Sequence, residues 1–207
     1  MRDRSPIWIA MADLLLCVLA IVIAAVNPKS EAKGIDSKAD YLITAEWQIE
    51  HSDADVDLWV LPPPGEVPVY YKNREVGLTM LDQDCLGKSN STVALADGSV
   101  VAAKTCRETI TLRGIVPGRY DLAVNLYHIN DEQGRSISDD AEGLGIKVHV
   151  EIAQLNPTVK IMFQGELTLD RTKQTINFAS FELTAENEFK LKPPPIEPIT
   201  DKFLAPQ

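Results

Sequence analysis

The chain has 207 residues with 20 basic and 30 acidic side chains, which give a formal net charge of −10. This acidic balance argues against general binding to nucleic acid, which requires a basic surface. The length accommodates a membrane anchor and one domain of about 150 residues. Hydrophobic residues make up 45% of the chain, as in ordinary folded proteins, so we do not expect the chain to be disordered overall.

An apolar run follows the short polar N-terminus, residues 1–6. Residues 7–26 are apolar except for Asp13, and a helix of about 20 residues spans about 30 Å, one hydrocarbon core. We predict a transmembrane helix here. Two other interpretations remain open, namely a signal peptide cleaved after Ala24 and a plain anchor with Asp13 at the membrane interface.

Asp13 is the unusual residue of this run. An aspartate in mid-membrane costs about 2.5–3.5 kcal/mol on insertion scales, and such residues usually line a path for ions or protons. At helical spacing, Asp13 shares one stripe with Cys17, Ala20 and Ala24. Small residues let membrane helices pack closely, so the stripe predicts a helix–helix interface that contains the carboxyl group.

The segment "MADLLLCVLAIVIAAVNP" resembles the transmembrane helix of the flagellar stator B subunit and its relatives in the ExbD/TolR family. The resemblance implies that Asp13 carries a proton or a sodium ion. It implies a homodimer of this chain inside a ring of five larger, multi-span subunits of the stator A, ExbB or TolQ type. It also implies a bacterial inner-membrane protein with a cytoplasmic N-terminus and a periplasmic body.

The rest of the chain has the pattern of an antiparallel β-sandwich. Residues 27–40 form a polar linker, and the segments that follow alternate apolar with polar residues and are rich in β-branched and aromatic side chains. We predict a sandwich over residues 41–190 and an extended, proline-rich tail over 191–207. The predicted strands cover 41–49, 55–61, 67–71, 108–115, 119–129, 146–155, 160–169 and 175–183.

Part of the body resembles a family of bacterial extracytoplasmic β-sandwich domains of unknown function. The segments that carry the resemblance are "DVDLWVLPPPGEVPVYYKN", "LDQD" and "ETITLRGIVPGRYDLAVNLYH". The glycine-rich stretch of that family is replaced here by "CLGKSNSTVALADGSVVAAKTC", which begins at Cys85 and ends at Cys106. These cysteines form a disulfide in an oxidising compartment, or else remain as two reduced structural cysteines.

Two groups of aspartates suggest a metal site. Asp53, Asp55 and Asp57 alternate at the start of a predicted strand, and Asp82 and Asp84 alternate further along the chain. Calcium takes six to eight oxygen ligands, so the five carboxylates could share one calcium ion. Solvated turns capped by aspartates are the alternative.

Motifs of catalysis are not found in the sequence. There is no nucleophile elbow, phosphate loop or HExxH sequence, so we predict a protein that is not an enzyme and has no cofactor other than possible calcium. The leading hypothesis is an inner subunit of a motor driven by the proton-motive force. In it, the sandwich passes torque or force to an unknown extracytoplasmic partner. The alternative is a membrane-anchored or secreted sandwich that serves as a non-catalytic adhesion or scaffold module.

Overall fold

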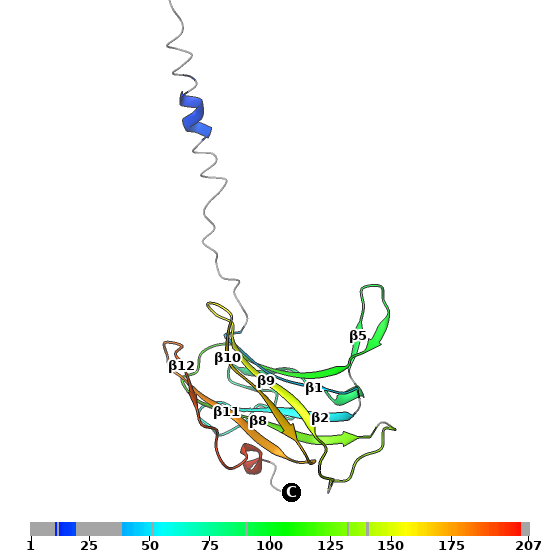
Figure 1. Cartoon of the computed structure of the whole chain (residues 1–207). Helices are drawn as coiled ribbons and strands as arrows, with labels where there is room; N and C mark the ends of the chain where they lie inside the picture. The colour runs from blue at the N-terminus through cyan, green and yellow to red at the C-terminus, as the bar shows by residue number, and fades with distance from the viewer. Residues whose placement is uncertain are drawn as a thin grey trace, which may run out of the picture. The chain divides into compact units, whose positions relative to one another are not determined.

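The computed structural model separates into an N-terminal unit, residues 1–36, and a second unit, residues 37–207, each described by itself (Figure 1). The structure describes residues 11, 13–19, 39–50, 52–89, 91–131, 133–139 and 141–203.

The N-terminal unit contains helical residues 13–19, with Leu14, Leu15 and Leu16 among the exposed apolar side chains. Among the described residues, no helix has both the length and the apolar character needed to cross a membrane. Most of the predicted span 7–26 lies outside the described residues. So do Ala20, Ala24 and the predicted linker up to residue 38.

The second unit is built on two antiparallel sheets. The larger sheet has six strands in this spatial order: β10 (Lys160–Leu169), β9 (Ile146–Gln154), β1 (Tyr41–Gln48), β7 (Thr105–Leu112), β4 (Thr79–Gln83) and β3 (Glu75–Val76). The smaller sheet has four: β12 (Phe189–Lys192), β11 (Thr175–Leu183), β8 (Gly118–Asn130) and β2 (Asp53–Leu61). The predicted mainly-β antiparallel architecture is therefore confirmed.

Alternation along the strands creates the core between the sheets. In β1 the side chains of Tyr41, Ile43, Ala45 and Trp47 are buried, and the residues between them are partly exposed. Strand β8 is buried without a break from Leu122 to Leu126, since Leu122, Val124 and Leu126 face this core and Ala123 lies in a separate apolar cluster. Stacked rings fill one part of this core, with 4.9 Å between the ring centroids of Tyr120 and Phe181.

Strand prediction was wrong at 67–71. Among the residues that the structure describes, Val69 pairs only with Val60 in an isolated bridge, and Tyr70 pairs only with Asn73. Proline has no N–H to donate to a sheet, and Pro68 lies within this segment while three more prolines, at 62–64, precede it. The short strands β3 and β4 follow the segment instead and extend the larger sheet.

The predicted extended tail is only partly right, because residues beyond 190 belong to the sandwich. Strand β12 pairs with β11, and the 3-10 helix η2 (Ile199–Lys202) follows it. Ile199 is 3% exposed and lies in a small apolar cluster with Trp59, Leu61 and Ala123. The domain therefore extends past the predicted boundary at residue 190.

Side chains of the larger sheet cover the open edge of β2, which is the last strand of its own sheet. The indole Nε1 of Trp47 donates to the carbonyl of Ala54 at 2.9 Å. The backbone N–H of Leu58 donates to the carboxyl of Glu108 at 2.6 Å. Both bonds satisfy polar backbone groups that an edge strand otherwise exposes.

Candidate functional sites

The first candidate site is the helical segment around Asp13. Asp13 and Cys17 both lie in the helix and are both exposed. Their spacing of four residues places them on one helical face. Asp13 is the only acidic residue among the described helical residues, and its neighbours from Leu14 to Leu19 are apolar except for Cys17.

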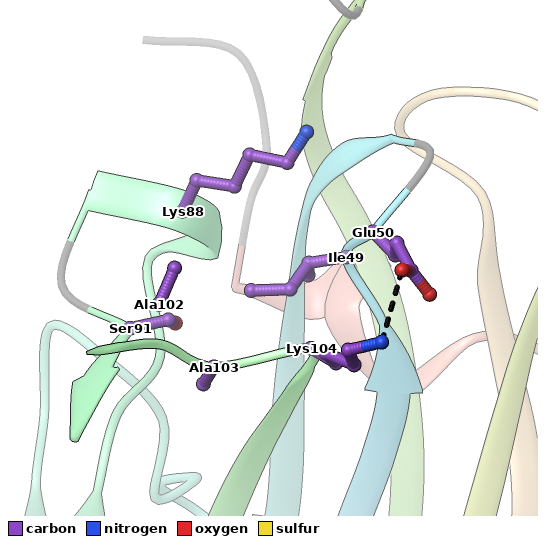
Figure 2. Close-up of a pocket in the computed structure, with 7 residues that line it drawn as sticks. All are labelled: Ile49, Glu50, Lys88, Ser91, Ala102, Ala103 and Lys104. Atoms are coloured by element: carbon purple, nitrogen blue, oxygen red, sulfur yellow. Dashed lines mark hydrogen bonds and ion pairs between the residues drawn. The ribbon is translucent and has the colours of Figure 1, made fainter.

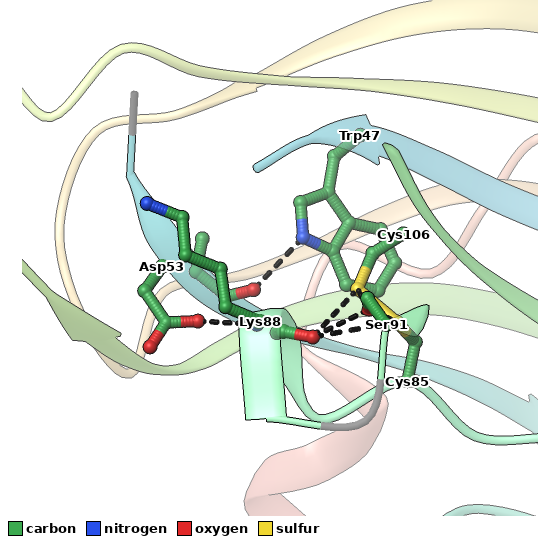
Figure 3. Close-up of a disulfide and its surroundings, with 8 residues drawn as sticks. Trp47, Asp53, Cys85, Lys88, Ser91 and Cys106 are labelled. Carbon is green, nitrogen blue, oxygen red and sulfur yellow. Dashed lines mark hydrogen bonds between the residues drawn. A yellow bond between two sulfur atoms is a disulfide. The ribbon is translucent and has the colours of Figure 1, made fainter. Parts of the chain in front are cut away.

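The second candidate site is a loop closed by a disulfide between Cys85 and Cys106, which are separated by 21 positions (Figure 3). The structure therefore has the first of the two cysteine states that the sequence left open. Both cysteines lie in the main core. The bond fixes the base of a loop that contains the short helix η1 (Gly87–Ser89) and two strands, β5 (Thr92–Ala94) and β6 (Val100–Ala102).

Asp53 holds η1 against the start of β2. Its Oδ1 accepts a hydrogen bond from the backbone N–H of Lys88 at 2.5 Å (Figure 3). Its Oδ2 accepts one from the side-chain amide of Asn130 at 3.1 Å. Gly87 has a φ of +66°, and a Cβ there would lie 2.3 Å from Asp53 Oδ1. Glycine is therefore required at position 87 by both its backbone conformation and the close carboxylate.

A cavity of about 320 Å³ lies at the base of this loop and is lined by Ile49, Ser91 and Ala102 among others. Lys88 and Lys104 also line it, and Lys104 pairs with Glu50 at 3.2 Å (Figure 2). This ion pair is exposed and contributes little to stability. The cavity combines apolar walls with a charged rim of Glu50, Lys88 and Lys104.

The third candidate site is a group of four acidic residues, Asp55, Asp57, Asp84 and Glu108, which we term the buried carboxyl cluster. The negative charges of Asp55, Asp57 and Asp84 each raise the pKa of another member of this cluster. Asp57 is 2% exposed and Glu108 is 1% exposed. Asp57 Oδ2 and Glu108 Oε1 have no hydrogen-bond partner among the described residues.

Burial is the largest cause of the raised pKa values of Asp55, Asp57 and Glu108. Burial, followed by the charges of Asp55 and Asp84, raises the pKa of Asp57 to about 8. Burial and then the charge of Asp84 raise the pKa of Asp55 to about 6, while His128 and Lys173 lower it. Burial and the charge of Asp57 raise the pKa of Glu108 well above its usual range. We therefore expect Asp57 and Glu108 to hold protons at neutral pH, because burial disfavours the ionised form of a carboxyl group.

The predicted calcium site is not found. In the described parts of the chain, no group of three or more histidine, cysteine, aspartate or glutamate side chains is arranged to hold a metal ion. Asp82 instead contacts Thr111 and Arg113, both at 2.5 Å. Asp53 accepts a hydrogen bond from the backbone N–H of Lys88 in η1. Of the five predicted ligands, only Asp55, Asp57 and Asp84 come together, and Glu108 completes the cluster.

The aromatic rings beside this cluster form a continuous chain. The ring centroids of Trp59 and Tyr70 are 3.9 Å apart, and those of Tyr70 and Tyr71 are 5.3 Å apart. Tyr71 in turn contacts Tyr127, over which the Lys173 ammonium lies at 4.1 Å. These rings and the lysine are neighbours of the buried carboxyl cluster, since Lys173 also acts on Asp55 and Asp57.

Comparison with known proteins gives little further guidance. No protein-family description matches the chain, and no curated protein matches it. Among solved structures, the chain is similar to one titled "Crystal structure of unknown function protein SAV2460". The similarity has a TM-score of 0.43 and 13% identity, and it covers 76% of this chain and 88% of the other.

Proposed function

We propose that the protein is a non-catalytic inner subunit of a membrane motor driven by the proton-motive force. Two copies would lie inside a ring of five larger, multi-span subunits of the stator A, ExbB or TolQ type. Asp13 would bind and release a proton as partner helices pass it. The β-sandwich, on the periplasmic side of the inner membrane of a bacterium, would transmit torque or force to an extracytoplasmic partner.

The observation that carries this proposal is the helix around Asp13. A lone carboxyl among exposed leucine and valine side chains is costly in lipid, and it becomes useful where a partner protein surrounds it. Cys17 lies one helical turn away on the same face. A small residue at that place allows a second helix to approach the carboxyl.

Two features of the sandwich support the role given to it. The disulfide between Cys85 and Cys106 suits an oxidising compartment such as the periplasm. The bond between Leu58 and Glu108 and the bond between Trp47 and Ala54 join the two sheets. Hydrogen bonds between the two sheets suit a domain that transmits force from the membrane to a partner.

The proposal is tested by purifying the full chain from membranes together with the multi-span protein encoded beside it. Native mass spectrometry counts the subunits for the wild type and for Asp13→Asn. We expect two copies within a larger ring for both proteins, because the substitution removes only the charge. A lone monomer, or a processed chain that begins after Ala24, would overturn the proposal.

A second function is favoured by the loop that the disulfide closes. Val93, Val100 and Val101 on β5 and β6 are exposed, and such apolar surface is typical of binding modules. The protein would then be an anchored or secreted adhesion or scaffold module. In that case Asp13→Leu should be tolerated, whereas a motor should lose its function.

A further inference from the structure

The hairpin of β5 and β6 stands apart from both large sheets. The two strands pair only with each other among the described residues, with Val93 opposite Val101 and Ala94 opposite Val100. Figure 1 shows the hairpin, labelled β5, extending away from the sandwich. A two-stranded hairpin is only marginally stable by itself in water and gains stability from a third strand or a packed face.

The hairpin exposes apolar side chains on both faces. Val93 is 48% exposed, Val100 is 65% exposed and Val101 is 42% exposed. Thr92 and Ala102 at the strand ends are also exposed. The outer edges of both strands carry backbone groups with no strand beside them in the described structure, and such edges pair readily with another strand.

The charge distribution indicates which strand could pair there. The chain has a formal net charge of −10, so most of its surface repels a second copy. The segment 91–103, "STVALADGSVVAA", contains one charged residue, Asp97, which lies at the turn. Lysine and proline usually guard an exposed edge, and neither occurs on β5 or β6. Strands β5 and β6 therefore add no charge repulsion of their own to a contact with a second copy.

The disulfide restrains the base of the hairpin. Cys85 and Cys106 close the loop at its base, and Ser91, next to β5, is buried beside them (Figure 3). Fixing the base lowers the entropy that the hairpin would lose on pairing.

We propose that two copies of this chain associate through the outer edge of this hairpin and form a continuous antiparallel four-stranded sheet around a two-fold axis. Identical strands satisfy such an axis, because antiparallel pairing makes the contact self-complementary. The inference rests on the hairpin and not on Asp13. It applies to the motor, where it would bring two sandwiches together, and also to an adhesion module.

Site-directed crosslinking in the full chain tests the proposal. Cys17→Ser removes the free thiol, and Val93→Cys or Val101→Cys then places one thiol at the centre of β5 or β6. Central residues of two-fold related antiparallel strands face each other at about 4.5–5.5 Å. We expect mild oxidation to give a covalent dimer in most of the protein for one of these two variants. Val159→Cys, at a position 71% exposed in the turn after β9, is the control and should stay monomeric.

A second variant checks the result without new thiols. Thr92→Lys with Ala102→Lys puts a charge on each strand at exposed positions, so the sandwich should melt as the wild type does. We expect at least a tenfold weaker dimer by analytical ultracentrifugation. Absence of crosslinks at both hairpin positions, or equal crosslinking at Val159, would overturn the proposal. Dimers that form only when lipid vesicles are added would also overturn it, in favour of a membrane-binding hairpin.

Asp13→Asn separates this inference from the proposed function. The hairpin crosslink should persist in that variant, because the carboxyl takes no part in the strand contact. A crosslink that is present while no ring of larger subunits co-purifies would support the hairpin contact and contradict the motor. Loss of the crosslink in Asp13→Asn would contradict the hairpin contact as an independent one.

Discussion

The backbone N–H of Leu58 donates a 2.6 Å hydrogen bond to Oε2 of Glu108, and this bond joins the edge of the smaller sheet to a strand of the larger one. A glutamate that is 1% exposed is rare in a sandwich core and needs a reason to be there. Here its carboxyl supplies the acceptor that the open edge of β2 lacks.

Substitution of Glu108 should therefore separate its hydrogen bond from its charge. Glu108→Ala leaves the Leu58 N–H buried and unsatisfied, which costs about 1–3 kcal/mol in the free energy of unfolding. Glu108→Gln keeps an acceptor oxygen and should cost less. Urea unfolding measures both variants, with the exposed Glu166→Gln as the control. A Glu108→Ala protein as stable as the wild type would contradict this account of the sheet contact.

The buried carboxyl cluster should make stability depend on pH. An aspartate in the unfolded chain has a pKa of about 4, whereas Asp55 titrates at about 6 and Asp57 at about 8 in the folded protein. The folded state then binds protons more tightly than the unfolded chain. The contribution of this cluster is therefore greatest below pH about 4 and is lost as the pH rises through about 6 and about 8.

Asp57→Asn tests this pH dependence. The amide cannot ionise, so the variant should lose less stability than the wild type as the pH rises from about 5 to about 9. This range extends about 1 pH unit below the pKa of Asp55 and about 1 pH unit above that of Asp57. Urea unfolding at a series of pH values measures the free energy of unfolding of both proteins. Asp97→Asn is the matched control, because Asp97 is exposed and lies in the hairpin turn. Equal pH profiles for wild type and Asp57→Asn would show that Asp57 does not carry the effect.

Removal of the disulfide should loosen the hairpin and lower stability. A bond that closes a loop of this size contributes about 3 kcal/mol in the chain-entropy treatment. We expect Cys85→Ser with Cys106→Ser to lower the unfolding free energy by roughly that amount. Hydrogen exchange should rise most in β5 and β6. Unchanged exchange there would mean that the bond does not hold the hairpin.

Ile199 should matter although it lies in the proline-rich C-terminal region. Its side chain packs against Trp59 and Ala123, so Ile199→Ala should cost about 2–5 kcal/mol. Ile196, which is fully exposed, gives the matched control, and Ile196→Ala should change the melting temperature little. Equal melting temperatures for the two variants would show that the C-terminal region is not part of the folded domain.

Much of the sandwich could be predicted from the sequence because long strands alternate visibly. In β7, Glu108 lies on the same face as Ile110 and Leu112. Because these two residues are apolar, their alternation with Glu108 already indicates that the glutamate is buried. The predicted calcium site was based on the spacing of the aspartates along each strand. That spacing does not reveal which residues of other strands bind them. Asp82 has an arginine partner from β7's end, Arg113, which sequence spacing alone does not reveal.

The C-terminal region and the hairpin show two other limits of sequence reasoning. Prolines predict extended chain, but they do not tell whether Ile199 finds an apolar surface on the neighbouring sheet. Strands of two or three residues, such as β3 and β5, are too short for alternation to mark them. Tertiary pairing determines such elements, and a local pattern does not record it.

Asp13 is proposed to carry the proton of a membrane motor. The most direct test of this claim reconstitutes the full chain and its multi-span neighbour into vesicles and measures proton uptake under a membrane potential. We predict uptake by the wild-type complex, and loss of uptake with intact assembly in Asp13→Asn, because the asparagine amide cannot bind and release the proton. Equal uptake by the assembled Asp13→Asn complex would contradict the claim.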